Sequence, residues 1–126
     1  MSVVLDASAL LAMLLHEPGH DKVRGVLRGA AVSAVNMSEV YAKAAEKGLD
    51  VGAARQAFAT LPLDVLAFDE AHAFLAGQLR VSTRAFGLSF GDRACLATAM
   101  LEKRPVLTAD RAWLRLDLGV EIVPIR

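Results

Sequence analysis

Short apolar runs alternate with longer amphipathic segments along the whole chain. The short runs are aliphatic or β-branched and predict strands over residues 3–5, 31–35, 65–68, 106–108 and 121–125. The longer segments predict helices over residues 9–15, 20–28, 37–47, 51–61, 69–86, 90–103 and 110–116. Strands that alternate with helices usually form a mostly parallel sheet that is covered by helices on both faces. The pattern therefore predicts one α/β domain over residues 1–126.

Two of the predicted helices carry a clear packing signal. The segment over residues 9–15 is apolar on every side, which is typical of a buried helix. The long segment over residues 69–86 places Ala71, Phe74, Leu75 and Leu79 on one face, and we expect that face to contribute to the core.

Four acidic residues fall where the predicted strands end or the following helices begin. Asp6 ends the first strand, and Asp110 lies two residues beyond Thr108, at the end of the fourth. Glu39 and Asp92 lie in the first turns of two predicted helices. In a parallel sheet the carboxyl ends of the strands share one edge, and ligands bind there. We expect at least three of the acids at that edge, whereas Asp92 follows a helix and is placed less firmly by connectivity.

Each of these acids also has a purely structural explanation. Asn36 with Glu39, and Ser89 with Asp92, have the spacing of capping boxes, and the other two acids suit the N-cap position. For any single acid we favour capping. A cluster of four carboxylates is different, because their mutual repulsion must be offset by positive charge. Hard divalent cations prefer oxygen ligands, so the set as a whole indicates a metal site.

Composition narrows the class of protein. The 126 residues suit a single domain, and 55% hydrophobic residues supply a core. The chain has 14 basic residues (Lys and Arg) and 14 acidic residues (Asp and Glu), so its charge alone does not indicate a nucleic-acid binder. This argument would not apply if bound cations offset a cluster of the acids. No basic segment precedes Asp6, and the apolar run over residues 9–15 is too short to span a bilayer. We therefore expect a soluble, cytoplasmic protein with no membrane segment.

The segments around the four acids resemble the motifs of PIN domains, in the family's order. The segments are VLDASALL over residues 4–11, SAVNMSEV over 33–40, LSFGDRACLATA over 88–99 and LTAD over 107–110. Size and motif form are most similar to the VapC-like toxins of toxin–antitoxin pairs. One departure is Arg93, which stands directly after the third acid, where family members often have a small residue.

The resemblance implies a three-layer α/β/α sandwich with a central, mostly parallel sheet. It implies an endoribonuclease that depends on Mg²⁺ or Mn²⁺, with catalytic and metal-binding roles for Asp6, Glu39, Asp92 and Asp110. It implies supporting roles for Ser8 and Thr108, whose hydroxyls orient neighbouring carboxylates. It also implies an RNA substrate, a homodimer and a cognate antitoxin that blocks the acidic site.

Several other residues have competing interpretations. Two interpretations remain open for the basic residues near the acids and on the long helix: contacts with phosphates, or simple ion pairs such as that of Glu39 with Lys43. These basic residues are Lys43, Arg80, Arg84, Arg93 and Arg111. His16 and His20 match the H-E-x-x-H zinc pattern, but Pro18 and Gly19 lie between them and break the required helix.

Neither Cys95 nor Ser8 is expected to be a nucleophile. Cys95 lies among small apolar residues and predicts a buried thiol. Ser8 lacks the G-x-S-x-G elbow of α/β hydrolases, and no histidine is placed to activate it. Trp113 is expected to pack in the core rather than anchor a partner.

The sequence also bears on functions other than that of a toxin nuclease. A haloacid-dehalogenase-like phosphohydrolase needs Asp-x-Asp after the first strand, but this chain has Asp6-Ala7-Ser8. A receiver domain needs additional acids near that strand and a late lysine, which are missing. A PIN nuclease of RNA processing and a catalytically silent PIN-like scaffold remain alternatives.

Overall fold

The computed structural model describes residues 2–126 and consists of a parallel sheet with helices on both faces. The strands are β1 (Val4–Leu5), β2 (Ala30–Ser33), β3 (Leu63–Leu66), β4 (Val106–Thr108) and β5 (Ile122–Pro124). The α-helices are α1 (Ala7–Leu15), α2 (His20–Gly25), α3 (Ala34–Glu46), α4 (Val51–Ala59), α5 (Glu70–Ser82) and α6 (Phe90–Glu102). Two 3₁₀ turns, Arg84–Phe86 and Arg111–Arg115, follow α5 and β4. The predicted order of strands and helices is therefore confirmed.

The strand order of the sheet is β3-β2-β1-β4-β5, and every pairing is parallel. The chain first builds outward from β1 through β2 to β3, and then returns to the other side of β1 with β4. The order thus reverses between β1 and β4, whose register pairs Leu5 with Leu107. Open α/β sheets bind ligands beyond the carboxyl ends of the strands at such a reversal.

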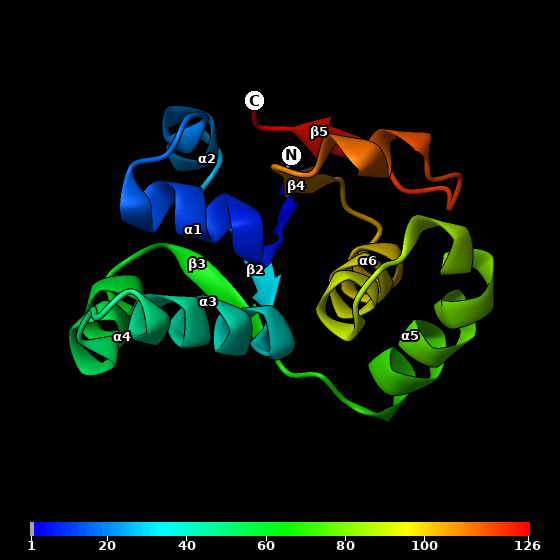
Figure 1. The fold of residues 1–126 in the computed structure, drawn as a ribbon, viewed down its shortest axis with the longest axis horizontal. Coiled ribbons are helices and arrows are strands. Elements are labelled where there is room, and N and C mark those ends of the chain that lie inside the picture. Colours follow the sequence, from blue (N-terminus) through cyan, green and yellow to red (C-terminus); the bar gives the residue numbers. More distant parts are fainter. Residues whose placement is uncertain (1) are drawn as a thin grey trace.

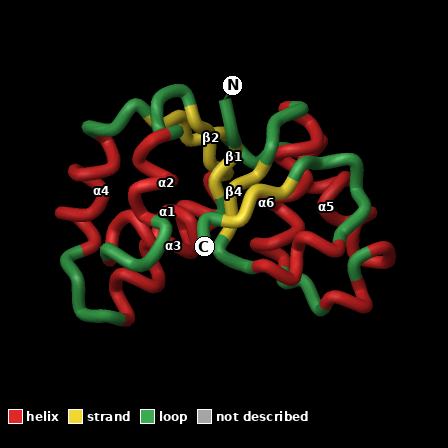
Figure 2. The backbone as a smooth tube through the Cα atoms, turned by 90° about the horizontal axis from the view of Figure 1, so that it is seen from above, coloured by secondary structure: helices red, strands yellow, loops and turns green. Residues whose placement is uncertain are grey.

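The sheet separates two apolar clusters, because successive strand residues point to opposite faces. Leu5 and Val32 pack in the cluster that includes α1, α2, α3 and α4. Val4 and Ala31 pack in the cluster that includes α5, α6 and the buried Trp113. Figures 1 and 2 show these two groups of helices on either side of the strands. The predicted three-layer α/β/α sandwich and the core position of Trp113 are both confirmed.

Two helices start earlier than the apolar pattern predicts. Helix α1 begins at Ala7 because Asp6 is its N-cap, and α3 begins at Ala34 because Ser33 is its N-cap. The side chains of Asp6 and Ser33 accept hydrogen bonds from the amides of Ala9 and Val35. The hydrogen bonds of a polar N-cap define the first residue of a helix more precisely than apolar periodicity does. They satisfy first-turn amides that have no partner within the helix.

The predicted buried face of the long helix is partly wrong. Leu79 is buried and Leu75 is half-buried, but Ala71 is exposed and so is Phe74, at 62%. Helix α5 packs mainly on α6, so the buried face of α5 is the face that is turned toward α6. The helix also ends at Ser82, four residues earlier than predicted, and the 3₁₀ turn Arg84–Phe86 follows it.

Two further points concern the H-E-x-x-H pattern at His16 and His20 and the search for membrane-spanning helices. His16 ends α1 with a left-handed φ of 57°, and Gly19 has a φ of 94°, so no continuous helix joins the two histidines. The zinc-protease interpretation was therefore set aside correctly. No helix within residues 2–126 combines the length and the apolar character needed to cross a membrane.

Helix α6 offers a matched test of the core. Leu96 is fully buried between the sheet and α5, whereas Leu101 in the same helix is 43% exposed. Leu96→Ala should lower the free energy of unfolding by about 2–5 kcal/mol, and Leu101→Ala should lower it by less than about 1 kcal/mol. Urea unfolding followed by circular dichroism measures both values. Equal losses for the two variants would contradict this assignment of the core.

Candidate functional site

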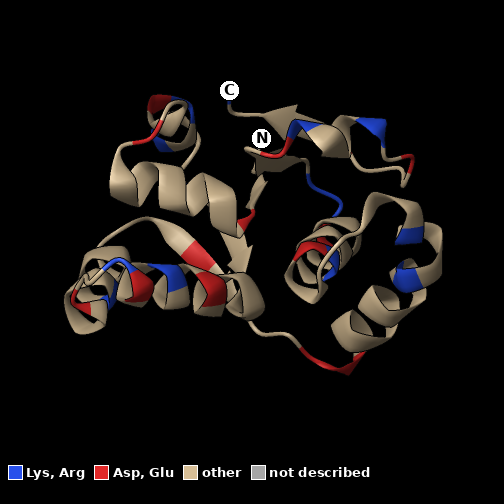
Figure 3. Cartoon of the chain, viewed as in Figure 1, with Lys and Arg blue, Asp and Glu red and all other residues tan. Residues whose placement is uncertain are grey.

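Four carboxylates from four separate parts of the chain line one pocket at the reversal of strand order. The pocket has a volume of about 210 Å³, and its walls are Asp6, Ala7, Ser8, Leu11, Asn36, Glu39, Asp92, Asp110 and Trp113. Asp6 follows β1 and Asp110 follows β4, while Glu39 lies in α3 and Asp92 in α6. Figure 3 shows acidic segments of α3 and α6 and the end of β1 toward the centre of the molecule. We call this the acidic pocket.

Asp6 is the most buried of these acids. Its Oδ1 accepts hydrogen bonds from the Ser8 hydroxyl at 2.7 Å and the Ala9 amide at 2.9 Å, and its Oδ2 accepts one from the Thr108 hydroxyl at 2.6 Å. Burial raises the pKa of Asp6 from 3.8 to about 6, although these hydrogen bonds lower it, and the nearby charge of Asp92 raises it slightly further. Among the described residues, the hydrogen-bond donors to this carboxylate are therefore all neutral.

Glu39 is held against the start of α6. The Asn36 amide group donates one hydrogen bond to Glu39 Oε1 at 2.7 Å and another to the Gly91 carbonyl at 3.0 Å. A Cβ atom at position 91 would overlap with the Glu39 carboxylate, so only glycine leaves room for it. Asn36 lies inside α3 and does not cap it, because the N-cap is Ser33. The capping-box interpretation of Asn36 with Glu39 is thus wrong.

Asn36 and Gly91 are therefore residues of the site that sequence reasoning missed. The available signal was the spacing of three between Asn36 and Glu39, which places both side chains on one helix face. Nothing in the sequence places Gly91 beside Glu39, since α3 and α6 are far apart along the chain.

Asp92 and Asp110 combine capping with exposure to the acidic pocket. Asp92 Oδ2 accepts from the Ser89 amide at 3.0 Å, completing the predicted capping box of α6. Asp110 Oδ1 accepts from the Ala112 amide at 3.0 Å and caps the following 3₁₀ turn. Their second oxygens, and Oε2 of Glu39, accept no hydrogen bond from the described residues. Capping therefore leaves one oxygen of each acid available.

The supporting hydroxyls form a short network behind Asp6. Besides its bond to Asp6, the Ser8 hydroxyl accepts from the Ala109 amide at 2.9 Å, and the Thr108 hydroxyl accepts from the Asp110 amide at 3.0 Å. Each hydroxyl thus joins the segment after β1 to the segment after β4. Ser8 has no histidine partner, so its hydroxyl orients a carboxylate and is not activated as a nucleophile.

The donor set suits a hard divalent cation, although the side chains do not yet converge on one point. Within residues 2–126, no three His, Cys, Asp or Glu side chains are already arranged to hold one metal ion. The acidic pocket nevertheless has four carboxylates in its walls and no lysine, arginine or histidine. Carboxylate oxygens with no internal cation match the chemistry by which proteins hold Mg²⁺.

Two residues close to Asp92 in the sequence, Arg93 and Cys95, do not line the acidic pocket. Arg93 donates to the Ala76 carbonyl at 2.9 Å and lies over the Phe90 ring, so it packs against α5. Its charge therefore does not occupy the acidic pocket. Cys95 is fully buried, and burial raises the pKa of its thiol, with further increases from the charges of Asp6, Asp92 and Glu39. The predicted inert thiol agrees with this environment.

Comparison with known proteins identifies the family. The PIN domain profile matches residues 3–118, which is most of the chain. The chain belongs to the PIN domain family. The resemblance that rested on the four acidic motifs is thereby confirmed. A comparison with curated proteins gives no match for this chain.

Solved structures show the same PIN fold over the full chain. A chain of a toxin–antitoxin complex from Klebsiella pneumoniae has 18% identity and a TM-score of 0.80, with 98% of each chain covered. A DNA-bound VapBC complex from Salmonella typhimurium gives 17% identity and 0.76, with 100% of this chain and 99% of that chain covered. VapBC-5 from Mycobacterium tuberculosis gives 22% identity and 0.66, with 98% of each covered. At these identities the likeness is one of fold.

The close approach of Gly91 to Glu39 in this PIN domain predicts that a side chain at position 91 displaces the Glu39 carboxylate. Gly91→Ala should leave the fold intact but force the Glu39 carboxylate out of place, because that carboxylate ends a flexible side chain. We expect Mn²⁺ affinity, measured by calorimetry, to fall by about tenfold or more, as for lost support of metal ligands. Gly77→Ala is the control, since a Cβ there meets nothing within 4 Å. Equal Mn²⁺ affinity in the two variants would contradict the positioning of Glu39.

The raised pKa of Asp6 predicts a pH-dependent stability difference in metal-free protein. The folded-state pKa of about 6 exceeds the ordinary 3.8, so the folded PIN domain holds this proton more tightly than the unfolded chain. Wild type should therefore lose stability relative to Asp6→Asn as the pH rises from about 4 to 6, by on the order of 3 kcal/mol. Urea unfolding in EDTA between pH 4 and 8 measures this difference. A constant difference across that range would show that Asp6 titrates normally.

Proposed function

We propose that this chain is an endoribonuclease that depends on Mg²⁺ or Mn²⁺ and acts as the toxin of a toxin–antitoxin pair. The observation that carries the proposal is the acidic pocket, where four carboxylates meet without any basic side chain in its walls. Membership of the PIN family and the fold shared with VapBC chains support the same conclusion.

The four acids are proposed to hold the cation, and their neighbours to position them. Asp6 is fixed by Ser8 and Thr108, and Glu39 is fixed by Asn36. Asp92 and Asp110 stand at the starts of helical segments, with one oxygen each free of hydrogen bonds from the described residues. Amide groups at helix starts also favour the negative charge of these acids.

The chemistry proposed for this site is hydrolysis of an RNA phosphodiester by water. A bound divalent cation lowers the pKa of water and neutralises charge on phosphate and on the leaving oxygen. Neither Ser8 nor Cys95 supplies the nucleophile in this scheme, since the Ser8 hydroxyl is hydrogen-bonded to Asp6 and Cys95 is buried. Attack by water with departure of the 3′ oxygen would leave 5′-phosphate and 3′-hydroxyl ends.

The partners follow from the same proposal. The Klebsiella, Salmonella and Mycobacterium structures are toxin–antitoxin complexes, and we extend that arrangement to this chain. A cognate antitoxin would insert a basic side chain into the acidic pocket, where the unbalanced charge of the acids would attract it. A homodimer and a cytoplasmic location belong to the same proposal.

Asp92→Asn tests the nuclease directly. Asn retains an oxygen that can accept from the Ser89 amide, so the fold should survive while one ligand charge is lost. We expect wild type to cut total RNA only with Mg²⁺ or Mn²⁺, and the variant to be at least about 100-fold slower. Mapping of new 5′ ends identifies the cuts. The control is Asp64→Asn, which neutralises an exposed acid on β3 outside the acidic pocket.

Two outcomes separate the alternatives. A folded wild type that binds no Mn²⁺ and never cuts RNA would indicate a catalytically silent scaffold. Growth arrest on induced expression of wild type, absent with Asp92→Asn, is expected of a toxin, whereas cleavage without growth arrest would favour a nuclease of RNA processing.

A further inference from the structure

The acidic pocket cannot by itself hold the RNA chain on either side of the cut. Its walls contain no basic side chain, and bound cations can do little more than offset its own carboxylates. Proteins position nucleic acids mainly through cationic and polar contacts to phosphates. Cations outside the acidic pocket, but next to it, must therefore supply these contacts.

A second pocket adjoins the acidic one. It has a volume of about 430 Å³, lies between α1 and α3, and is lined by Ser8, Leu11, Leu15, Glu17, Lys43, Glu46 and Lys47. Ser8 and Leu11 also line the acidic pocket, so the two hollows share a wall. We call this second hollow the α1–α3 groove.

The lysines of the α1–α3 groove are aligned with a site acid. Glu39 and Lys43 in α3 and Lys47 at its C-cap recur at intervals of four, and residues four apart lie on the same helix face. Because an α-helix rises 1.5 Å per residue, the lysines stand about 6 and 12 Å along the axis from Glu39. They form a line of positive charge that leads away from the acidic pocket.

The two arginines that directly follow site acids in the sequence both donate to backbone carbonyls. Arg93 donates to the Ala76 carbonyl, and Arg111 donates to the Arg126 carbonyl. By contrast, the Lys43 side chain is 60% exposed, and within residues 2–126 its ammonium group forms one ion pair, with Glu46 at 3.6 Å. An exposed pair at that distance is weak and readily exchanged for another anion. Of the two interpretations that the sequence leaves open for Lys43, the ion pair with Glu39 does not form, and Lys43 pairs with Glu46 instead.

We propose that the α1–α3 groove binds the RNA backbone on one side of the scissile bond, with Lys43 and Lys47 contacting its phosphates. The proposal rests on the nuclease function and names the part of the site that holds its substrate. Glu17 and Glu46 also line the groove, so its net charge is near zero and the lysines bind only moderately. Glu46 competes directly with phosphate for Lys43.

This arrangement predicts opposite effects for neighbouring substitutions. The double variant Lys43→Gln with Lys47→Gln should bind a fluorescent single-stranded RNA about tenfold more weakly. For this variant, the slope of log affinity against log salt concentration should be less steep by about 1.4, because each lost phosphate contact accounts for about 0.7. Glu46→Gln should instead bind the RNA more tightly, because it frees Lys43. All proteins carry Asp92→Asn to prevent cleavage, and fluorescence anisotropy in Mg²⁺ at several salt concentrations gives the affinities.

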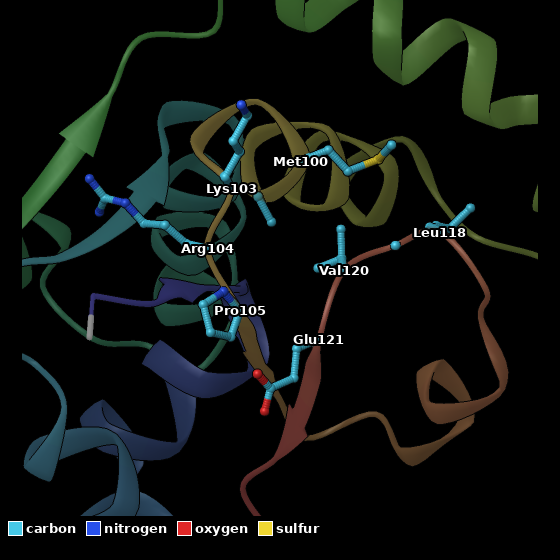
Figure 4. Close-up of a pocket in the computed structure, with 9 residues that line it drawn as sticks. Met100, Lys103, Arg104, Pro105, Leu118, Val120 and Glu121 are labelled. Carbon is cyan, nitrogen blue, oxygen red and sulfur yellow. The ribbon is translucent and has the colours of Figure 1, made fainter.

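Lys103→Gln is the control for the loss of an exposed lysine far from the acidic pocket, and it is compared with each single variant, Lys43→Gln and Lys47→Gln, as well as with the double variant. Lys103 is an exposed lysine that ends α6 beside Pro105, in a separate pocket before the starts of β4 and β5, as Figure 4 shows. That pocket lies at the sheet edge opposite the acids. Removal of this lysine should leave RNA affinity unchanged. If the double lysine variant binds RNA as well as Lys103→Gln does, the proposal is overturned and the α1–α3 groove is free to serve a protein partner.

Cleavage kinetics distinguish failure of this proposal from failure of the nuclease proposal. With Asp92 restored, the double lysine variant should raise KM while kcat stays close to that of wild type. A lower kcat with unchanged KM would show that the lysines act on the acids and not on RNA, which overturns the inference. A wild type that does not cut RNA at all rejects the nuclease function instead, and the anisotropy comparison still decides whether the groove binds RNA.

Discussion

A buried carboxylate at the reversal of strand order is the constraint on which the site depends. Asp6 sits between the ends of β1 and β4 with three hydrogen bonds, all from neutral donors. The parallel register that pairs Leu5 with Leu107 places Thr108 beside it. Because burial raises the pKa of Asp6 to about 6, the fold bears the cost of an ionised group here at neutral pH. A bound cation would remove that cost.

Helix capping by the acids of this protein is compatible with the cation binding that we propose. An ionised carboxylate has two oxygens and about four acceptor positions, so one oxygen can satisfy a helix amide while the other faces a ligand. Asp92 and Asp110 use their oxygens in this way. Their capping bonds hold them at the pocket wall before any ligand arrives, which reduces the ordering that binding requires.

The contact between α3 and α6 joins the site to the fold. Asn36 bonds at once to the Glu39 carboxylate and to the backbone at Gly91, one residue before Asp92. Two acids on different helices are therefore positioned by a single buried amide. The absence of a side chain at Gly91 brings the Glu39 carboxylate against α6, so small shifts of either helix would alter the placement of both acids.

The sequence by itself determined the order of strands and helices, the acids at the strand ends and the family, because these depend on local periodicity and on short motifs. Only the tertiary structure placed Asp92 in the acidic pocket, turned Arg93 onto α5 and left Phe74 exposed. It alone showed that Asn36 holds Glu39 and that Lys43 and Lys47 line a groove beside Ser8. These features depend on how α3, α5 and α6 pack, and periodicity along one helix cannot specify which neighbour its side chains meet.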